Sequence, residues 1–261
     1  MQNFRLAYHY LLYRFRSFRL HGVHSPFVFN LYDNVIRHDG QYRAYPAIET
    51  LRKQLLQNKK TIAVTDFGAG SHMQASRSRT IKSLAAISAK PPKYAQLLFR
   101  LVNYFQPQTV LELGTSLGLS TCYLASARNK SQVYTFEGCP NLAAAAQQNF
   151  RKLRLNNIQV ITGNMDQTLA ATLDKMPAVD FVYFDGNHRY EPTMRYFEAC
   201  LAKRTHDSVF VLDDIYWSSE MVKAWQTICR HPEVTISIDL FQLGLIFFRQ
   251  KQPKQHFTLW Y

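Results

Sequence analysis

The sequence predicts an α/β fold in which helices cover both faces of a largely parallel sheet. Three observations support this prediction. From residue 93 onward, short apolar segments alternate with amphipathic segments of helical period. Glycine-rich or acidic turns directly follow several of the apolar segments. The last two apolar segments, 234–240 and 243–249, are separated by only two residues, which is too short for a crossover helix and predicts an antiparallel hairpin at one sheet edge.

The regular part of the chain begins with a helix expected over residues 94–105. A short buried strand follows at 109–113, and a tight turn at 114–118 leads into a helix that ends near residue 128. The remaining strands are expected at 132–136, 158–162, 180–184 and 208–212, and the helices between them at 141–155, 166–175, 189–203 and 218–230.

Composition limits the class of protein. The chain has 261 residues, of which 47% are hydrophobic, so it can bury a full core and is not a disordered chain. It has no uninterrupted apolar run of membrane-spanning length, and His9, Arg14 and Arg16 interrupt the apolar N-terminal segment, unlike a secretory signal. The 4 cysteines lie far apart, which predicts neither a zinc knuckle nor a disulfide framework. We therefore expect a reduced, cytoplasmic protein.

Positive charge is concentrated in the first part of the chain. Residues 1–100 contain 16 Lys and Arg against 4 Asp and Glu, whereas residues 101–261 contain 15 against 14. The first 45 residues also hold 11 of the 36 aromatic side chains. We therefore expect a basic, aromatic N-terminal cap over residues 1–92, helical with a short strand and turn near 61–71, followed by a near-neutral domain over residues 93–261.

The cap is expected to begin with an amphipathic helix. Its apolar side chains follow a 4-3-4-3 spacing and fall on one narrow stripe, formed by Phe4, Tyr8, Leu11, Phe15 and Phe18. Two interpretations remain open. In the first, the stripe packs on the second domain and the arginines are solvated. In the second, the helix forms a surface for an anionic partner such as phospholipid headgroups, RNA or an acidic carrier. Such a helix is also able to form a homodimer.

The turn after the strand at 109–113 has the features of a ligand-binding turn. Gly114 and Gly118 let the main chain bend sharply and approach a ligand, and the next helix presents its N–H groups there. The spacing differs from the G-x-G-x-x-G of dinucleotide binders. Glu137 ends the following strand, 23 residues beyond Gly114, where an acid is able to accept hydrogen bonds from both ribose hydroxyls.

The segment from Val110 to Gly118, together with Glu137 and the terminal hairpin, resembles the class I S-adenosylmethionine-dependent methyltransferases over roughly residues 90–250. The resemblance implies a Rossmann-like, doubly wound, mostly parallel seven-stranded sheet with a C-terminal antiparallel hairpin, and S-adenosylmethionine as cofactor. It places Glu112, Gly114, Ser116 and Gly118 around the methionine part of the cofactor, Glu137 at its ribose, and Gly163, Asn164, Met165 and Asp166 beside its adenine.

A second acid-and-glycine segment occurs at residues 65–71. A cofactor turn requires a strand with a terminal acid about 20 residues later. The sequence instead reaches Pro91 and Pro92, which end any regular element. We interpret residues 61–71 as a strand and turn of the cap, and an independent nucleotide site remains the alternative.

Acidic residues also follow the fourth and fifth strands of the alternating pattern. Asp185 follows the strand at 180–184, and Asp213 and Asp214 follow the strand at 208–212. We expect the three carboxylates to converge. Because they repel one another unless a cation neutralises them, they suggest a hard divalent ion such as Mg²⁺, Ca²⁺ or Mn²⁺.

This acidic arrangement resembles the metal-dependent O-methyltransferases of the catechol and caffeoyl-CoA type and their relatives that act on sugar hydroxyls. The resemblance implies Asp185, Asp213 and Asp214 as metal ligands. The chain departs from the catechol type, which has an Asp-Asn pair in place of Asp213-Asp214 and a lysine base that is missing here. The Asp-x-x-His spacing of some sugar-type relatives makes His188 the candidate base, with Asp185 beside it. A helix-capping role for Asp213 and a structural role for His188 remain open.

The sequence therefore predicts an S-adenosylmethionine-dependent O-methyltransferase that acts on a small-molecule or lipid-linked hydroxyl. Whether a divalent metal assists the reaction remains open. One alternative is an RNA ribose or protein methyltransferase whose basic cap holds a polyanion. A second alternative is a non-catalytic binding module that keeps the fold and the cofactor pocket.

Overall fold

The structure is a computed structural model that describes residues 2–17, 24–65 and 77–261. Its contacts divide the chain into two compact units. We call Gly40–Pro177 the middle unit, and Met1–Asp39 together with Ala178–Tyr261 the terminal unit. Residues 1–92 thus contribute to both units, and their role as a separate cap stays a prediction. No helix in the described part of the chain has the length and apolar character that a membrane span requires.

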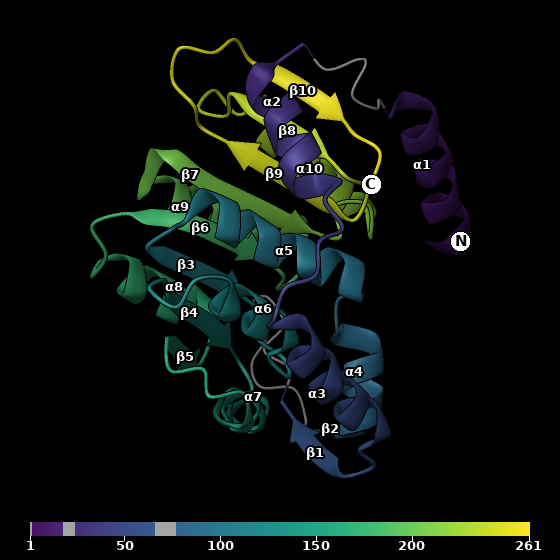
Figure 1. The fold of residues 1–261 in the computed structure, drawn as a ribbon, viewed down its shortest axis with the longest axis vertical. Coiled ribbons are helices and arrows are strands. Elements are labelled where there is room, and N and C mark those ends of the chain that lie inside the picture. The colour runs from purple at the N-terminus through teal and green to yellow at the C-terminus, as the bar shows by residue number, and fades with distance from the viewer. Residues whose placement is uncertain (1, 18–23, 66–76) are drawn as a thin grey trace. The chain divides into compact units, whose positions relative to one another are not determined.

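The middle unit contains three parallel strands in the order β3-β4-β5 (Figure 1). A separate antiparallel pair, β1 and β2, lies earlier in the same unit. The strands are β1 (Thr61–Val64), β2 (Arg77–Thr80), β3 (Thr109–Leu113), β4 (Gln132–Glu137) and β5 (Ile158–Thr162). The helices are α3 (Tyr45–Gln57), α4 (Ile81–Ser88), α5 (Pro92–Phe105), α6 (Leu119–Ala127), α7 (Pro140–Lys152) and α8 (Met165–Leu173).

The local sequence explains where these helices begin. Proline occupies the first turn of α3, α5 and α7, where its missing N–H is not needed. Thr80 and Asn164 cap α4 and α8 with side-chain oxygens that accept from backbone N–H groups. A core cluster that includes the rings of Tyr45, Phe99 and Tyr123 packs these helices together.

The terminal unit contains five strands in the order β10-β8-β9-β7-β6. The strands are β6 (Val179–Phe184), β7 (Arg204–Asp213), β8 (Ile236–Asp239), β9 (Leu243–Phe247) and β10 (Gln255–Thr258). The helical segments are α1 (Gln2–Arg16), α2 (Pro26–Leu31), the π-helix η2 (Tyr32–Ile36), α9 (Tyr190–Leu201) and α10 (Ser219–Arg230). Strands β6 and β7 are parallel, whereas β9 runs antiparallel to both β7 and β8.

Every strand and helix predicted between residues 94 and 249 is present, with ends that differ by a few residues. The antiparallel hairpin of β8 and β9 is confirmed. Its predicted position at the sheet edge is wrong, because β10 pairs in parallel with β8, with Gln255 opposite Ile236. The hairpin therefore lies inside the strand order of the terminal unit, and β10 forms the outer strand there.

The predicted N-terminal helix is confirmed as α1. Of the two interpretations of its apolar stripe, the one in which the stripe packs on the second domain is wrong. Phe4, Tyr8, Leu11 and Phe15 are all exposed. The opposite face packs instead, and Tyr13 is its buried residue. The fifth member of the stripe, Phe18, lies outside the described residues.

Candidate functional site

In the middle unit, strand pairing brings Glu137 next to the glycine turn. Strands β3 and β4 pair with Leu113 opposite Phe136, so the residues that follow each strand emerge side by side. The Ser116 N–H donates to Glu137 Oε2 at 2.8 Å, and the Cys139 N–H donates to Glu137 Oε1 at 2.9 Å. The carboxylate is therefore held at the turn, as the spacing between Gly114 and Glu137 predicts.

The turn itself requires glycine. Gly114 and Gly118 have φ angles of 115° and 78°, in the region that side chains disfavour. A Cβ atom on Gly118 would lie 2.4 Å from Cε1 of Phe150, so a side chain there would clash with the helix α7 ring. Ser116 also has a positive φ, 49°, and its hydroxyl lies 2.8 Å from the Ser88 hydroxyl. The backbone of the turn from Gly114 to Gly118 is thus fixed in a sharply bent path.

Glu112 is fully buried below this turn. Its Oε2 accepts hydrogen bonds from the hydroxyls of Thr121 and Thr135. Burial raises the pKa of Glu112 from 4.5 to about 7, and the hydroxyl partners only partly oppose this shift. Its Oε1 is buried and has no hydrogen-bond partner among the residues that the structure describes. This orphaned acceptor fits a cationic ligand group such as the ammonium of a methionine.

The raised pKa predicts a pH-dependent stability. The folded state binds the Glu112 proton more tightly than the unfolded state, so stability is lost as pH rises from about 4.5 to about 7. The shift corresponds to about 3 kcal/mol. We expect the Glu112→Gln variant to lack this loss of stability. The free energy of unfolding of the variant minus that of the wild type should therefore be larger at pH 8 than at pH 5. Urea denaturation of both proteins at the two pH values measures it, and parallel pH profiles would contradict it.

The loop after β5 lies next to Glu137. The Gly163 N–H donates to the Glu137 carbonyl at 3.0 Å, and Gly163 has a φ of 137°. Asn164 caps helix α8, because its Oδ1 accepts from the Asp166 N–H at 3.0 Å. Met165 is half-buried and Asp166 is exposed. The structure thus places Gly163 beside the acid of β4, while the Asn164 side chain serves the helix.

In the terminal unit, strand pairing brings two acids together. Strands β6 and β7 pair with Phe184 opposite Leu212, so Asp185 and Asp213 leave the sheet side by side. Ligand atoms of Asp185, His188 and Asp213 all lie within 4.8 Å of one another. His188 Nε2 is 3.7 Å from Asp185 Oδ1, and Asp213 is only 1% exposed. Two carboxylates and an imidazole therefore form a compact group that we call the acidic triad.

Asp214 is not part of the acidic triad. Its backbone has a φ of 50°, its N–H donates to the Gln242 carbonyl, and its own carbonyl accepts from the Trp217 N–H. Of the four predicted residues, the structure brings together Asp185, His188 and Asp213 and leaves out Asp214. His188 therefore replaces Asp214 as the third candidate ligand. A set with an imidazole nitrogen suits Mn²⁺, Fe²⁺ or Zn²⁺ as well as Mg²⁺, which is broader than the oxygen-only set that the sequence suggested.

Sequence reasoning missed the hydroxyl groups around Glu112. Thr115, Thr121 and Thr135 form a buried network with the acid, and the hydroxyls of Thr115 and Thr135 lie 2.6 Å apart. A threonine in a strand, a turn or a helix has no distinctive pattern, so the available signal was the acid within the apolar strand. The segment at 65–71 lies outside the described residues from Asp66 onward.

Comparisons with known proteins find methyltransferases similar in sequence and in fold. Residues 111–215 match a family model described as a methyltransferase domain. The chain is 30% identical to the catechol O-methyltransferase of Niastella koreensis over 148 residues, which cover 55% of this chain and 65% of that protein. The match thus spans less than two thirds of the relative's length.

Solved structures share the fold. An O-methyltransferase from Bacillus cereus in complex with SAH has a TM-score of 0.57 at 16% identity, with 83% of this chain and 94% of that chain covered. An SAH-bound methyltransferase of Podospora anserina has a TM-score of 0.60 at 13% identity, with 87% and 97% covered. These similarities show the Rossmann-like methyltransferase fold, with a mostly parallel sheet and antiparallel C-terminal strands. The chain thus has the Rossmann-like methyltransferase fold, and over about half of its length it is similar to a catechol O-methyltransferase.

Proposed function

We propose that this protein transfers a methyl group from S-adenosylmethionine to a hydroxyl of a small molecule. The observation that carries the proposal is the acidic triad, whose ligand atoms of Asp185, His188 and Asp213 lie within 4.8 Å of one another at the ends of β6 and β7. A base and a charged anchor for a hydroxyl are what O-methylation requires. The similarity to methyltransferases supports this choice of methyl donor.

The cofactor would be held by the middle unit. Glu112, Gly114, Ser116 and Gly118 would surround its methionine part, and the buried Glu112 Oε1 would accept from the ammonium group. Glu137 would accept from the ribose hydroxyls. The loop Gly163–Asp166 would flank the adenine. When bound, S-adenosylmethionine supplies a methyl group that is attached to a positively charged sulfonium. The sulfur leaves as a neutral thioether when this methyl group is transferred.

A divalent cation fits the acidic triad. Asp185 and Asp213 would hold it, because their carboxylates emerge side by side and one of them is almost fully buried. Two carboxylates in such proximity repel each other, and a cation removes that repulsion. When bound, the cation lowers the pKa of a coordinated hydroxyl.

In the proposed mechanism, His188 acts as the base. Its neutral imidazole accepts the hydroxyl proton, and the carboxylate of Asp185, 3.7 Å from Nε2, stabilises the imidazolium that results. The oxygen then attacks the methyl carbon as the C–S bond breaks. Asp213 is buried at the end of β7, so its carboxylate would hold a fixed position in this group.

The substrate class follows from the relative that is named a catechol O-methyltransferase. We propose an aromatic compound with two adjacent hydroxyls, since one hydroxyl is able to anchor the molecule while the neighbour is deprotonated. Trp217 follows the triad along the chain and is 50% exposed, so its ring is available for stacking. A lipid-linked hydroxyl is a second, separate class of substrate that we propose.

Methyl transfer to catechol tests the proposal. The purified protein is incubated with S-adenosylmethionine and catechol, with Mg²⁺ or Mn²⁺ and, in parallel, with a chelator. We expect a singly methylated product by mass spectrometry that the chelator abolishes. Methylation of RNA or protein but not of catechol would favour the alternative substrates, and cofactor binding without any transfer would favour a binding module.

A further inference from the structure

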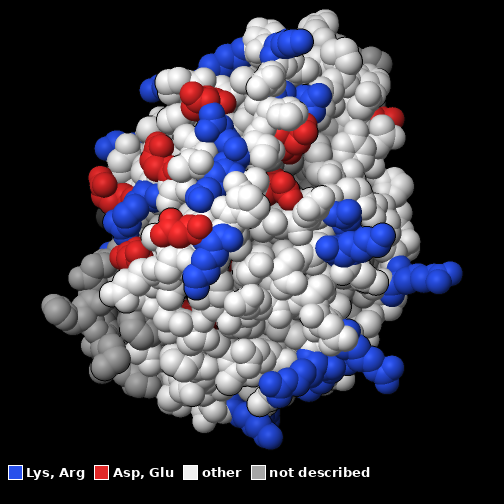
Figure 2. All heavy atoms as spheres, turned by 90° about the vertical axis from the view of Figure 1, so that its left-hand side faces the viewer, with Lys and Arg blue, Asp and Glu red and all other residues white. Residues whose placement is uncertain are grey.

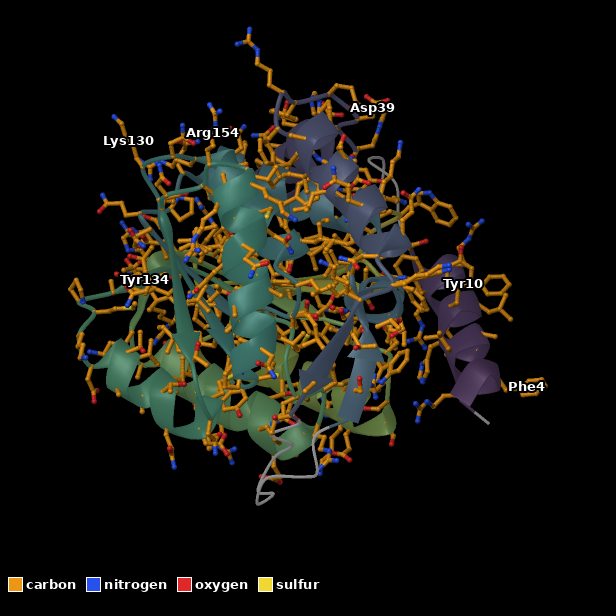
Figure 3. All side chains as sticks on the ribbon, turned by 90° about the horizontal axis from the view of Figure 1, so that it is seen from below. Phe4, Tyr10, Asp39, Lys130, Tyr134 and Arg154 are labelled. Carbon is orange, nitrogen blue, oxygen red and sulfur yellow. The ribbon has the colours of Figure 1, made fainter. Side chains whose placement is uncertain are left out.

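Helix α1 presents an apolar face to solvent. Phe4 and Phe15 are 85% and 87% exposed, and Tyr8 and Leu11 between them are 60% and 57% exposed. We call these four side chains the α1 stripe. Figure 3 shows Phe4 extending away from the ribbon. Large rings exposed side by side are unusual on a protein surface and indicate a binding surface.

The α1 stripe belongs to a helix that is fixed to the terminal unit. The Tyr13 hydroxyl donates to the Leu259 carbonyl at 2.6 Å and accepts from the Tyr261 N–H at 2.9 Å. The Arg5 guanidinium donates to the Trp217 carbonyl at 2.7 Å. Because the opposite face of α1 is held by these bonds, the stripe is directed outward by the fold itself.

The charge around the stripe has one sign. Helix α1 carries Arg5, Arg14 and Arg16 and no acidic residue, and the first acid in the chain is Asp33. Arg14 and Arg16 are exposed. On the face drawn in Figure 2 the charge is mixed in the upper part of the view, where Asp and Glu lie among Lys and Arg. Aromatic rings flanked by arginines complement a surface that is apolar inside and anionic outside.

A second copy of the chain fits this face less well. The four side chains would bury on the order of 600 Å² per copy, below the ~800 Å² per partner of a stable interface. The spacing is that of a coiled-coil seam, but such seams use Leu, Ile or Val, and flanking acids that pair with basic residues. The charged residues of helix α1 are all arginines, so two copies would repel each other.

We propose that the α1 stripe docks the protein on the surface of membranes that contain anionic phospholipids. Phe4, Tyr8, Leu11 and Phe15 insert at the level of the headgroups, and Arg14 and Arg16 contact the phosphates. The loop after Asp213 is linked to the same helix, because Arg5 binds Trp217, whose side chain is 50% exposed. Docking on α1 therefore places this loop of the terminal unit near the lipid.

Vesicle co-sedimentation tests this docking. The full chain is mixed with vesicles of phosphatidylcholine alone or with about one third phosphatidylglycerol. We expect binding to the anionic vesicles that is at least tenfold tighter than to the neutral ones and that weakens with salt. The Phe4→Ala/Phe15→Ala variant should lose at least tenfold of this affinity, because each exposed ring contributes to insertion.

Ile87→Ala provides the matched control, since Ile87 is 75% exposed on helix α4 and belongs to the middle unit. This variant should bind the vesicles like the wild type. Calorimetry with S-adenosylmethionine verifies that all variants remain folded. Equal binding by the wild type and the Phe4/Phe15 variant overturns the proposal. The proposal is also overturned if the wild type forms a dimer in sedimentation that the Phe4/Phe15 variant does not form. Binding of the protein to RNA but not to vesicles overturns it as well.

Discussion

The Asp213→Asn variant is expected to bind Mn²⁺ at least ~100-fold more weakly than the wild type and to lose methyl transfer to a similar extent. Asp213 is 1% exposed within the acidic triad, so its carboxylate has few alternative positions. Asparagine keeps the shape of the side chain and removes its charge. The loss therefore reports the charge that the cation requires, and the isosteric change leaves the packing of β7 in place.

Asp214→Asn is the matched control. Asp214 is the next residue, but its carboxylate is not in the acidic triad, and asparagine tolerates the φ of 50° as aspartate does. We expect its Mn²⁺ affinity to stay within about threefold of the wild type. Titration of the free Mn²⁺ signal by electron paramagnetic resonance measures both variants, and calorimetry with the cofactor verifies folding. Equal losses in the two variants would contradict the assignment of the triad.

The strand-end residues were predictable because they depend on topology alone. Apolar segments that alternate with helices predict parallel pairing, and parallel pairing brings the residue after each strand to a common edge. The pairing of Phe184 with Leu212 then places Asp185 beside Asp213, and the pairing of Leu113 with Phe136 places Glu137 beside the glycine turn. None of this requires knowledge of side-chain packing.

The features that the sequence did not predict depend on packing between distant segments. A helical wheel shows that α1 has an apolar stripe, but it does not show that Tyr13 on the other face binds the backbone at Leu259. The direction of the stripe is decided by that contact. Strand β10 was missed because Gln255–Thr258 has only four residues, which is too short to show an alternation of apolar and polar side chains. Its pairing with β8 is made by backbone hydrogen bonds, which leave no pattern in the sequence.

The Glu137→Ala variant is expected to bind S-adenosylmethionine about 100-fold more weakly, from the loss of charge-assisted hydrogen bonds worth about 1.5–3 kcal/mol each. Glu137 accepts from the backbone N–H groups of Ser116 and Cys139, which aim its carboxylate at the glycine turn. A carboxylate has about four acceptor sites, so these two bonds do not exhaust it. The backbone bonds therefore orient the acid, and ribose hydroxyls would be the ligand groups that it receives.

Glu137→Gln should lie between the wild type and Glu137→Ala, because the amide keeps one acceptor oxygen but loses the charge and turns an NH₂ group toward one of the two backbone donors. Calorimetry with S-adenosylmethionine measures all three proteins, and Mn²⁺ binding at the acidic triad of the terminal unit verifies folding independently. A cofactor affinity of Glu137→Ala within about threefold of the wild type would mean that the acid serves only the turn. In that case the two backbone bonds would be its whole function, and the ribose would have to be held by other residues.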